Sequence, residues 1–225
     1  AGAAGMPSTP SDPPWVAALC KPELDFVNTD TTAQGKLFTD AVPDPSELVW
    51  AASRASCLTL YHSANEVKAV PSIALIVEDT DGVAYTAGNA VHLSTRYLKA
   101  VADRGEDLRL EITGIFHFAV SLVYENGGAS GDPAPPVWLI VGIADYVRLE
   151  SGYLDRAGRV KGGSYDSNSQ ATAFFLDYLA TKKPDVVYAL NQRLSPTAPL
   201  WTNDVFTSLF GSDIDALWAE YQATL

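Results

Sequence analysis

Residues 108–124 read LRLEITGIFHFAVSLVY, and residues 138–150 read WLIVGIADYVRLE. Both segments are mostly apolar, and the first is apolar on nearly all sides if it is drawn as a helix. A helix with that composition belongs in the middle of a domain rather than on its surface. These two segments therefore predict a buried helical centre in the second half of the chain.

The segments before this centre predict strands and one long helix. Residues 73–79, IALIVED, form a continuous apolar run rich in β-branched residues, which predicts a buried strand. After a turn signal, residues 83–94 are predicted to form further strand. Residues 46–61 carry apolar side chains at helical spacing, with Ser46 as the expected N-cap. Strands followed by helices predict an α+β fold.

The two ends of the chain complete the predicted organisation. Residues 25–38 are polar and carry no predicted element, whereas three later segments are expected to be helices: 170–179, 201–211 and 214–225. Proline and serine are concentrated in residues 7–14, and no second stretch of that kind divides the chain. The prediction is an extended, Pro/Ser-rich lead-in over residues 1–24 and one domain over residues 25–225, with a small mixed sheet followed by a mostly helical half.

Composition excludes several classes of protein. The chain has 225 residues, of which 47% are apolar and 19% are charged, and its net charge is −12. A chain of this size buries about 70% of its unfolded surface, which is enough for a full core and excludes a disordered protein. The acidic surface repels phosphate groups, so nucleic acid and anionic membrane surfaces are not expected as partners.

The N-terminus bears on location. The residues AGAAG precede Met6, the single methionine, and this pattern favours a cloning scar before a native start over a secreted chain trimmed at Ala1. No charged and apolar leader follows Met6, so a cytoplasmic location is predicted, with a secreted protein as the alternative. Cys20 and Cys57 are compatible with free thiols or with one bridge.

The order of short segments resembles a known family. The segments LFTDAV, CLTLY, DGVAYTAG, HLSTRYL, EITGI, GIADYVRLESGY and TAFFLDY occur in that order from about Asp25 to the C-terminus. This order resembles the plant basic secretory protein family, a group of zincin-like metallopeptidases also found in fungi and bacteria. The most specific match is GIADYVRLESGY, residues 142–153. The resemblance implies a single zincin-like α+β domain around an active-site helix.

The family's chemistry depends on two motifs. Its members carry a helix similar to G-V-L-Y-H-E-M-T-H, followed by E-G-I-A-D-Y-V-R. Two histidines four residues apart bind zinc on one helix face, and the glutamate between them activates water. The glutamate before G-I-A-D supplies a third ligand, and the aspartate of that motif orients a ligand histidine from behind.

The resemblance places apolar residues at all of the metal positions. The three zinc-ligand positions and the base position fall, in that order, on Phe118, Leu122, Val141 and Ala119. The aspartate is retained as Asp145, while a family tyrosine before T-A falls on Ser169. The chain is therefore predicted to be a degenerate member without a metal, without a cofactor and without zinc peptidase activity.

Two consequences of this replacement remain open. Either apolar side chains fill the former cleft, or the cleft stays open as an apolar pocket for a small molecule. The candidate substrate-binding residues are Phe118, Ala119, Ser121, Leu122, Val141, Tyr85, His92 and Ser169. The candidate catalytic residues are His117, Asp145 and Tyr124. His117 is more commonly a buried histidine bonded to a backbone carbonyl, and Asp145 can pair with Arg148 three residues on.

The sequence predicts a cofactor-free cyclase or isomerase acting on a hydrophobic secondary-metabolite intermediate, including a pericyclic, Diels–Alder-type step. A site that holds its substrate in a reactive conformer lowers the barrier without a metal. The alternative is a non-catalytic pseudopeptidase that binds a peptide or a small ligand as a decoy or inhibitor. No G-x-S-x-G, Walker A or G-x-G-x-x-G motif points to another class of enzyme, and the oligomeric state is left open.

Overall fold

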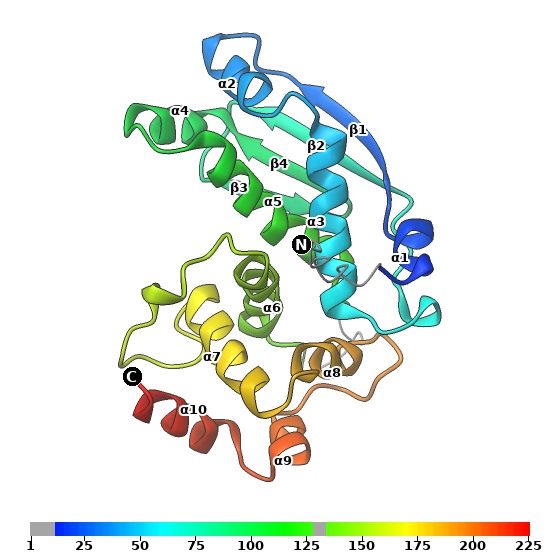
Figure 1. The fold of residues 1–225 in the computed structure, drawn as a ribbon, viewed down its shortest axis with the longest axis vertical. Coiled ribbons are helices and arrows are strands. Elements are labelled where there is room, and N and C mark those ends of the chain that lie inside the picture. Colours follow the sequence, from blue (N-terminus) through cyan, green and yellow to red (C-terminus); the bar gives the residue numbers. More distant parts are fainter. Residues whose placement is uncertain (1–11, 128–133) are drawn as a thin grey trace, which may run out of the picture.

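The computed structural model describes residues 12–127 and 134–225. A four-stranded sheet forms from β1 (Glu23–Asn28), β2 (Ser72–Glu78), β3 (Ala84–Ala87) and β4 (Ala90–Ser94). The strand order is β1-β2-β4-β3; β1, β2 and β4 run parallel, and β3 pairs antiparallel with β4. The sheet therefore has β3 as one edge, and the predicted α+β fold with a small mixed sheet is confirmed (Figure 1).

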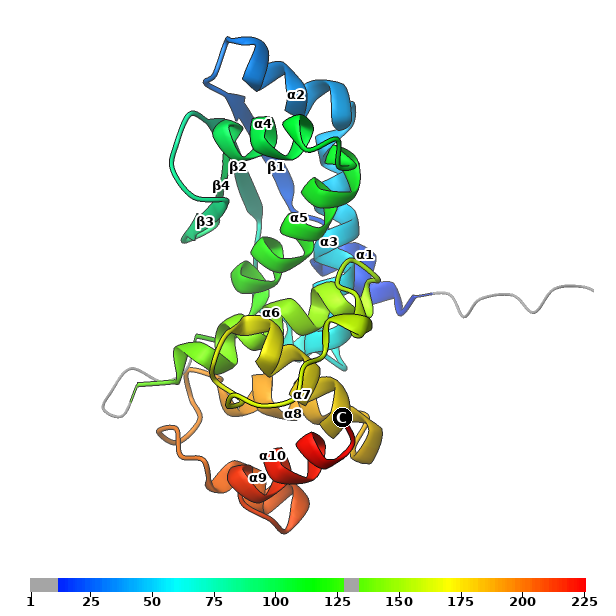
Figure 2. The same ribbon diagram turned by 90° about the vertical axis from the view of Figure 1, so that its left-hand side faces the viewer.

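Helices make up most of the rest of the described chain. They are α1 (Pro14–Leu19), α2 (Ala33–Ala41), α3 (Pro45–Leu60), α4 (Thr95–Asp103), α5 (Leu108–Tyr124), α6 (Val137–Glu150), α7 (Ser169–Lys182), α8 (Val186–Arg193), α9 (Asp204–Phe210) and α10 (Ile214–Ala223). Helices α3 and α5 lie on one side of the sheet, and α6 to α10 gather below it (Figure 2). None of the described helices is long and apolar enough to cross a membrane.

Helix α5 connects the sheet with the group of helices α6 to α10 (Figure 2). It packs against α3 on one side and α6 on the other, and Ile112, Phe116 and Val120 along it are completely buried. Asp107 caps its N-terminus by accepting a hydrogen bond from the backbone N–H of Leu110 at 3.0 Å. The expectation that this apolar helix lies at the centre of the domain is confirmed.

The sheet is buried unevenly on its two faces. In β2, Ile73, Leu75 and Val77 are completely buried, while Ile76 on the opposite face is only half-buried. Because strand side chains alternate between faces, only one face lies under the helices. The apolar run at residues 73–79 correctly predicts a strand, although only alternate residues reach the core.

The predicted lead-in is partly wrong. Residues 14–19 form α1, and Val16 is fully buried. Cys20, directly after α1, forms a disulfide with Cys57 of α3. The Cα atoms of the two cysteines lie 6.4 Å apart. Met6 and the residues before it, on which the cloning-scar interpretation rests, lie outside the described residues.

Two further expectations need correction. The polar stretch 25–38 contains most of β1 and the start of α2, and α8 was not predicted. The N-cap of α3 is Asp44, not Ser46: the Asp44 carboxylate accepts from the N–H groups of Ser46 at 3.0 Å and Glu47 at 3.1 Å. Pro45 occupies the first helical position, where its missing N–H costs nothing.

Candidate functional site

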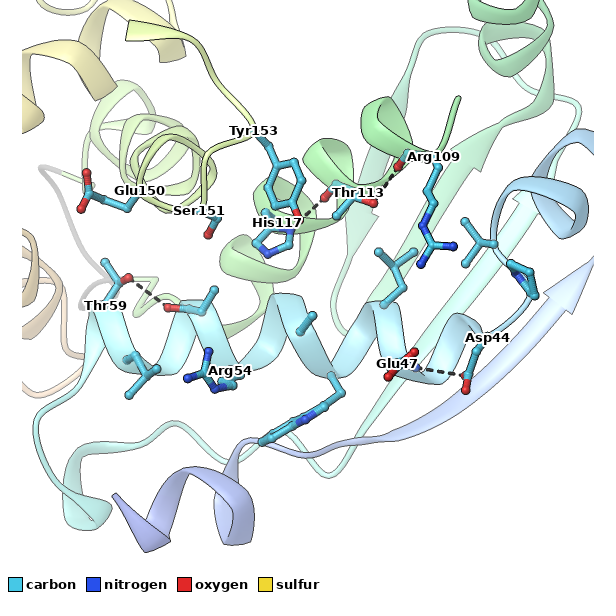
Figure 3. A pocket seen from close by; sticks show the side chains of 17 residues that line it. Asp44, Glu47, Arg54, Thr59, Arg109, Thr113, His117, Glu150, Ser151 and Tyr153 are labelled. Atoms are coloured by element: carbon cyan, nitrogen blue, oxygen red, sulfur yellow. Dashed lines mark hydrogen bonds between the residues drawn. The ribbon is translucent and has the colours of Figure 1, made fainter. Parts of the chain in front are cut away.

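A groove of about 820 Å³ runs along α3 and is closed on its other side by α5 and the end of α6 (Figure 3). The apolar part of its lining is Val42, Pro43, Leu48, Trp50, Ala51, Ala55 and Leu58, all from α3 or the turn before it. Across the groove, the lining from α5, α6 and the turn after α6 is Arg109, Thr113, His117, Glu150, Ser151 and Tyr153. The groove therefore has one mainly apolar wall and one mainly polar wall.

The polar wall follows from helical spacing. Arg109, Thr113 and His117 are four residues apart on α5, so they share one face of the helix. The rise of an α-helix separates the first and last of them by about 12 Å. One stripe of α5 thus presents a cation, a hydroxyl and an imidazole to the groove.

His117 is held in one protonation state. His117 is only 4% exposed, and its Nδ1 lies 2.8 Å from the backbone oxygen of Thr113. A carbonyl oxygen can only accept, so Nδ1 carries the proton. Burial lowers the pKa of His117 below its usual 6.5, and the Thr113 carbonyl offsets this only in part. At neutral pH the imidazole is therefore neutral, with its lone pair on Nε2.

Nε2 of His117 makes no hydrogen bond to any residue within 12–127 or 134–225. A neutral imidazole with a free Nε2 accepts a proton or a hydrogen bond, and it cannot donate from that atom. The expectation of a buried histidine bonded to a backbone carbonyl is confirmed. The same bond makes the groove-facing nitrogen a base rather than a donor.

Most charged groups at the groove already have partners. Arg54 makes two hydrogen bonds to the Asp12 carboxylate, and Glu150 is paired with Arg156. The Asp44 carboxylate caps α3. Among the lining residues, Arg109 and Glu47 make no ion pair with any residue that the structure describes.

The former zinc positions lie outside this groove. Phe118, Leu122 and Val141 are half-buried, Ala119 is 2% exposed, and none of these residues lines the groove. Their side chains carry no lone pair that could bind zinc. No group of three or more histidine, cysteine, aspartate or glutamate residues suited to a metal occurs in the described chain. The residues present at these positions do not fit the family's zinc ion.

Asp145 lies at the α6 surface that faces the core. Asp145 is 2% exposed, and its Oδ1 lies 3.6 Å from Nη1 of Arg148, which confirms the predicted pairing. Burial raises the pKa of Asp145, and the Ser169 hydroxyl and the Arg148 guanidinium offset this rise only in part. Oδ1 accepts no hydrogen bond from the described residues. Asp145 and half-buried Ser169 do not line the groove.

The remaining α5 candidates are enclosed at its C-terminal end. Tyr124 is completely buried, and its backbone oxygen accepts a hydrogen bond from the Tyr61 hydroxyl at 2.5 Å. Ser121 is also buried and donates to Oε1 of Glu125 at 3.0 Å. Neither side chain lines the groove. The predicted catalytic role of Tyr124 therefore has no route to a ligand bound there.

Tyr85 and His92 form a separate pair on the sheet. They face each other across β3 and β4, with ring centroids 4.2 Å apart and nearly parallel planes. Nδ1 of His92 lies 2.7 Å from Oε1 of Glu78, and Tyr85 is 47% exposed. These two residues are on the sheet and not in the groove.

The sequence missed the α3 wall, Arg109 and Tyr153. The Tyr153 ring lies against the His117 ring (Figure 3), and the two ring centroids are 4.6 Å apart. The four-residue spacing of Arg109, Thr113 and His117 is a signal that could have identified the polar wall. No local signal identifies Tyr153, because it approaches His117 from a turn 36 residues later in the chain.

Comparison with known proteins gives one finding about relationship. Residues 21–221 match the model of a family named BSP and described as a peptidase of plants and bacteria. No curated protein and no solved structure matches the chain. The match covers most of the chain, including the sheet, the groove and the former zinc positions.

Proposed function

The chain belongs to the BSP family of plant and bacterial peptidases, and we propose that it carries out a metal-free reaction of a small molecule in the groove beside His117. Peptide hydrolysis by the family's zinc mechanism needs ligands where this chain has Phe118, Leu122 and Val141. Its substrate would be a hydrophobic intermediate of secondary metabolism.

The free Nε2 of His117 carries this proposal. A general base works best when it is unprotonated at the working pH and points to where a substrate binds. The bond from Nδ1 to Thr113 fixes the tautomer, and burial keeps the ring neutral. The groove supplies the space for a substrate next to this base.

The shape and lining of the groove support a small amphiphilic substrate. Its volume of about 820 Å³ falls in the range of small-molecule sites, about 300–1,000 Å³. The α3 wall would hold the apolar body of the substrate, while oxygen atoms would face α5. A carbonyl compound with an acidic C–H meets both requirements.

The simplest reaction is an isomerisation. Nε2 takes a proton from the carbon next to a carbonyl, and the electron pair moves onto the carbonyl oxygen to give an enolate. The protonated imidazole then returns the proton to a different carbon, so no atom or electron is gained or lost. A cyclisation, including a Diels–Alder-type step, would follow if the groove holds the enol or diene in a folded conformer.

The location of the protein remains a proposal. Disulfides form and persist in oxidising compartments, so the Cys20–Cys57 bridge supports the secreted alternative over the predicted cytoplasmic location. The proposed chemistry is compatible with either location, because it needs no cellular cofactor.

A non-catalytic pseudopeptidase is the second candidate. The half-buried side chains of Phe118, Leu122 and Val141 are not part of the buried core. Strand β3 is an edge of the sheet, and an edge strand can pair with an extended peptide. Peptide binding at these apolar side chains or at the β3 edge would require no residue of the groove.

Metabolite profiling tests the proposed function. Deletion of the gene should cause an apolar intermediate to accumulate, and the purified protein should convert that intermediate without added metal. His117→Gln should abolish the conversion, whereas the control His92→Gln, on the sheet, should retain it. An unchanged metabolite profile would favour the pseudopeptidase, and full activity of His117→Gln would contradict the role of His117.

A further inference from the structure

Resting on the proposed function, we propose that Tyr153 is a second catalytic residue, the hydrogen-bond donor that complements the His117 base. Asp145 and Arg148 are positioning residues that hold Tyr153 over the groove. The proposal assigns a role to a buried carboxylate for which the proposed reaction has no direct use.

Tyr153 is fixed by its backbone. It follows Gly152, whose φ of +83° reverses the chain at the end of α6. The Tyr153 N–H donates to the Arg148 carbonyl at 3.0 Å, and the Tyr153 carbonyl accepts from Nε of Arg148 at 3.1 Å. Two hydrogen bonds to Arg148 thus fix the position of the Tyr153 backbone, from which the ring extends.

Gly114 makes room for this arrangement on α5. A Cβ built on Gly114 would lie 3.1 Å from Nε of Arg148 and 3.3 Å from Cβ of Tyr153. Both distances are shorter than ordinary van der Waals contact. The glycine therefore lets Arg148 and Tyr153 approach α5 one turn before His117, and the Tyr153 ring reaches the imidazole.

Asp145 contacts Arg148 and so belongs to the same series of contacts. Its carboxylate lies 3.6 Å from Nη1 of Arg148, whose Nε holds Tyr153. A buried carboxylate is costly unless it interacts with a cation, and Asp145 has no other ion-pair partner in the described chain. Its ion pair restrains the guanidinium, so the chain of contacts runs from Asp145 through Arg148 and Tyr153 to His117.

The Tyr153 phenol supplies the hydrogen-bond donor that neutral His117 lacks at Nε2. Nε2 of the neutral imidazole only accepts, whereas the Tyr153 hydroxyl can donate, and it makes no hydrogen bond to the described residues. When Nε2 removes a proton from carbon, negative charge develops on the substrate oxygen. A donor aimed at that oxygen stabilises the transition state more than the ground state.

The base and the donor can be tested with 5-nitrobenzisoxazole as a substrate. In its elimination a base takes the proton from C3, the N–O bond breaks, and a nitrile and a phenolate form. Tyr153→Phe should lower kcat by about tenfold or more and leave KM within about twofold, because removing such a donor affects mainly the transition state. The control Tyr85→Phe removes a hydroxyl from a tyrosine that also stacks on a histidine, and should change neither constant.

The positioning role is tested by a double-mutant cycle on the same reaction. Arg148→Met and Asp145→Asn should each lower kcat in the wild-type background, but by less than about twofold in the Tyr153→Phe background. Arg104→Met, a surface control, should have no effect in either background. Thermal unfolding confirms that each variant is folded.

The outcomes separate this inference from the proposed function. A wild-type rate no faster than buffer, or an unchanged rate for His117→Gln, would overturn both. A reduced rate for His117→Gln with an unchanged rate for Tyr153→Phe would overturn the donor role alone. Additive losses for Arg148→Met and Tyr153→Phe would overturn the positioning role.

Discussion

His117 and Phe118 are neighbours on α5 but face different surroundings, because successive helical side chains point about 100° apart. His117 lines the groove, whereas half-buried Phe118 lies outside it. Phe118, at the position of the family's first zinc ligand, and His117, the proposed base, therefore lie on different faces of α5.

The pH dependence of the reaction follows from the protonation state of His117. Its lowered pKa means that the base is half-protonated at a pH below 6.5. The rate of 5-nitrobenzisoxazole elimination should therefore fall on acidification, yet at pH 6.5 it should still exceed half of its value at pH 8. A half-maximal rate at pH 7 or above would contradict this assignment.

Glu125 predicts a second pH effect, on stability. Glu125 is completely enclosed; burial raises its pKa well above 4.5, with Ser121 and Lys68 offsetting this only in part. The unfolded chain loses this proton at a lower pH than the folded protein does. This contribution to stability is therefore present below about pH 4.5 and is lost as the pH rises through the folded-state pKa.

Glu125→Gln removes that titration and retains an acceptor for the Ser121 hydroxyl. In urea unfolding it should stabilise the protein more at pH 8 than at pH 4.5. Glu23→Gln, at an exposed glutamate at the start of β1, is the control for a general charge effect. An equal effect of Glu125→Gln at the two pH values would show that folding does not raise the pKa of Glu125.

Local contacts at the residue scale could be predicted from the sequence, and distant ones could not. The bond from His117 to the Thr113 carbonyl and the pair of Asp145 with Arg148 span four and three residues of a helix. Tyr153 and the α3 wall reach His117 from distant parts of the chain. Their approach depends on how α3, α5 and α6 pack, which no local pattern reports.

Among the elements, α6 and α7 come close together at Gly142. A Cβ there would lie 2.1 Å from Cγ2 and 2.4 Å from Cβ of Thr172. Thr172 cannot yield easily, because it is buried and its hydroxyl donates to the Tyr165 carbonyl at 2.6 Å. Segments with long apolar runs, α5, α6 and β2, were predicted correctly. In contrast, β1 and α2 were missed because polar residues interrupt their apolar ones.

Gly142→Ala should destabilise the protein by about 2 kcal/mol, since overpacking of a core contact costs about 1–3 kcal/mol. Gly127→Ala is the control, because no residue that the structure describes lies within 4 Å of a Cβ at that glycine. Urea unfolding of the two variants measures the difference. Equal midpoints would mean that α6 and α7 are farther apart than described.

At the scale of the whole molecule, the Cys20–Cys57 bridge ties the N-terminal helix to α3, the helix that forms the apolar wall of the groove. Cross-linking across 37 residues should stabilise the fold by about 4 kcal/mol through the entropy of the unfolded chain. The double variant Cys20→Ala/Cys57→Ala should lose most of that stability in urea. A reducing agent should destabilise the wild type but not the variant; equal responses would contradict the bridge.

The whole-molecule fold was predictable because the family resemblance extends across nearly the full chain, and the match over residues 21–221 shows that family. The location of the groove was not predictable. The resemblance predicts a site at the former zinc positions, whereas the groove depends on the packing of α3 against α5.

His117 presents to the groove a neutral Nε2 that makes no hydrogen bond to the described residues. A long-range ¹H–¹⁵N spectrum of protein labelled with ¹⁵N-histidine, assigned with His117→Gln, measures this state directly at pH 7. The structure predicts a proton on Nδ1 and none on Nε2. A proton on Nε2, or on both nitrogens, would contradict the proposed base.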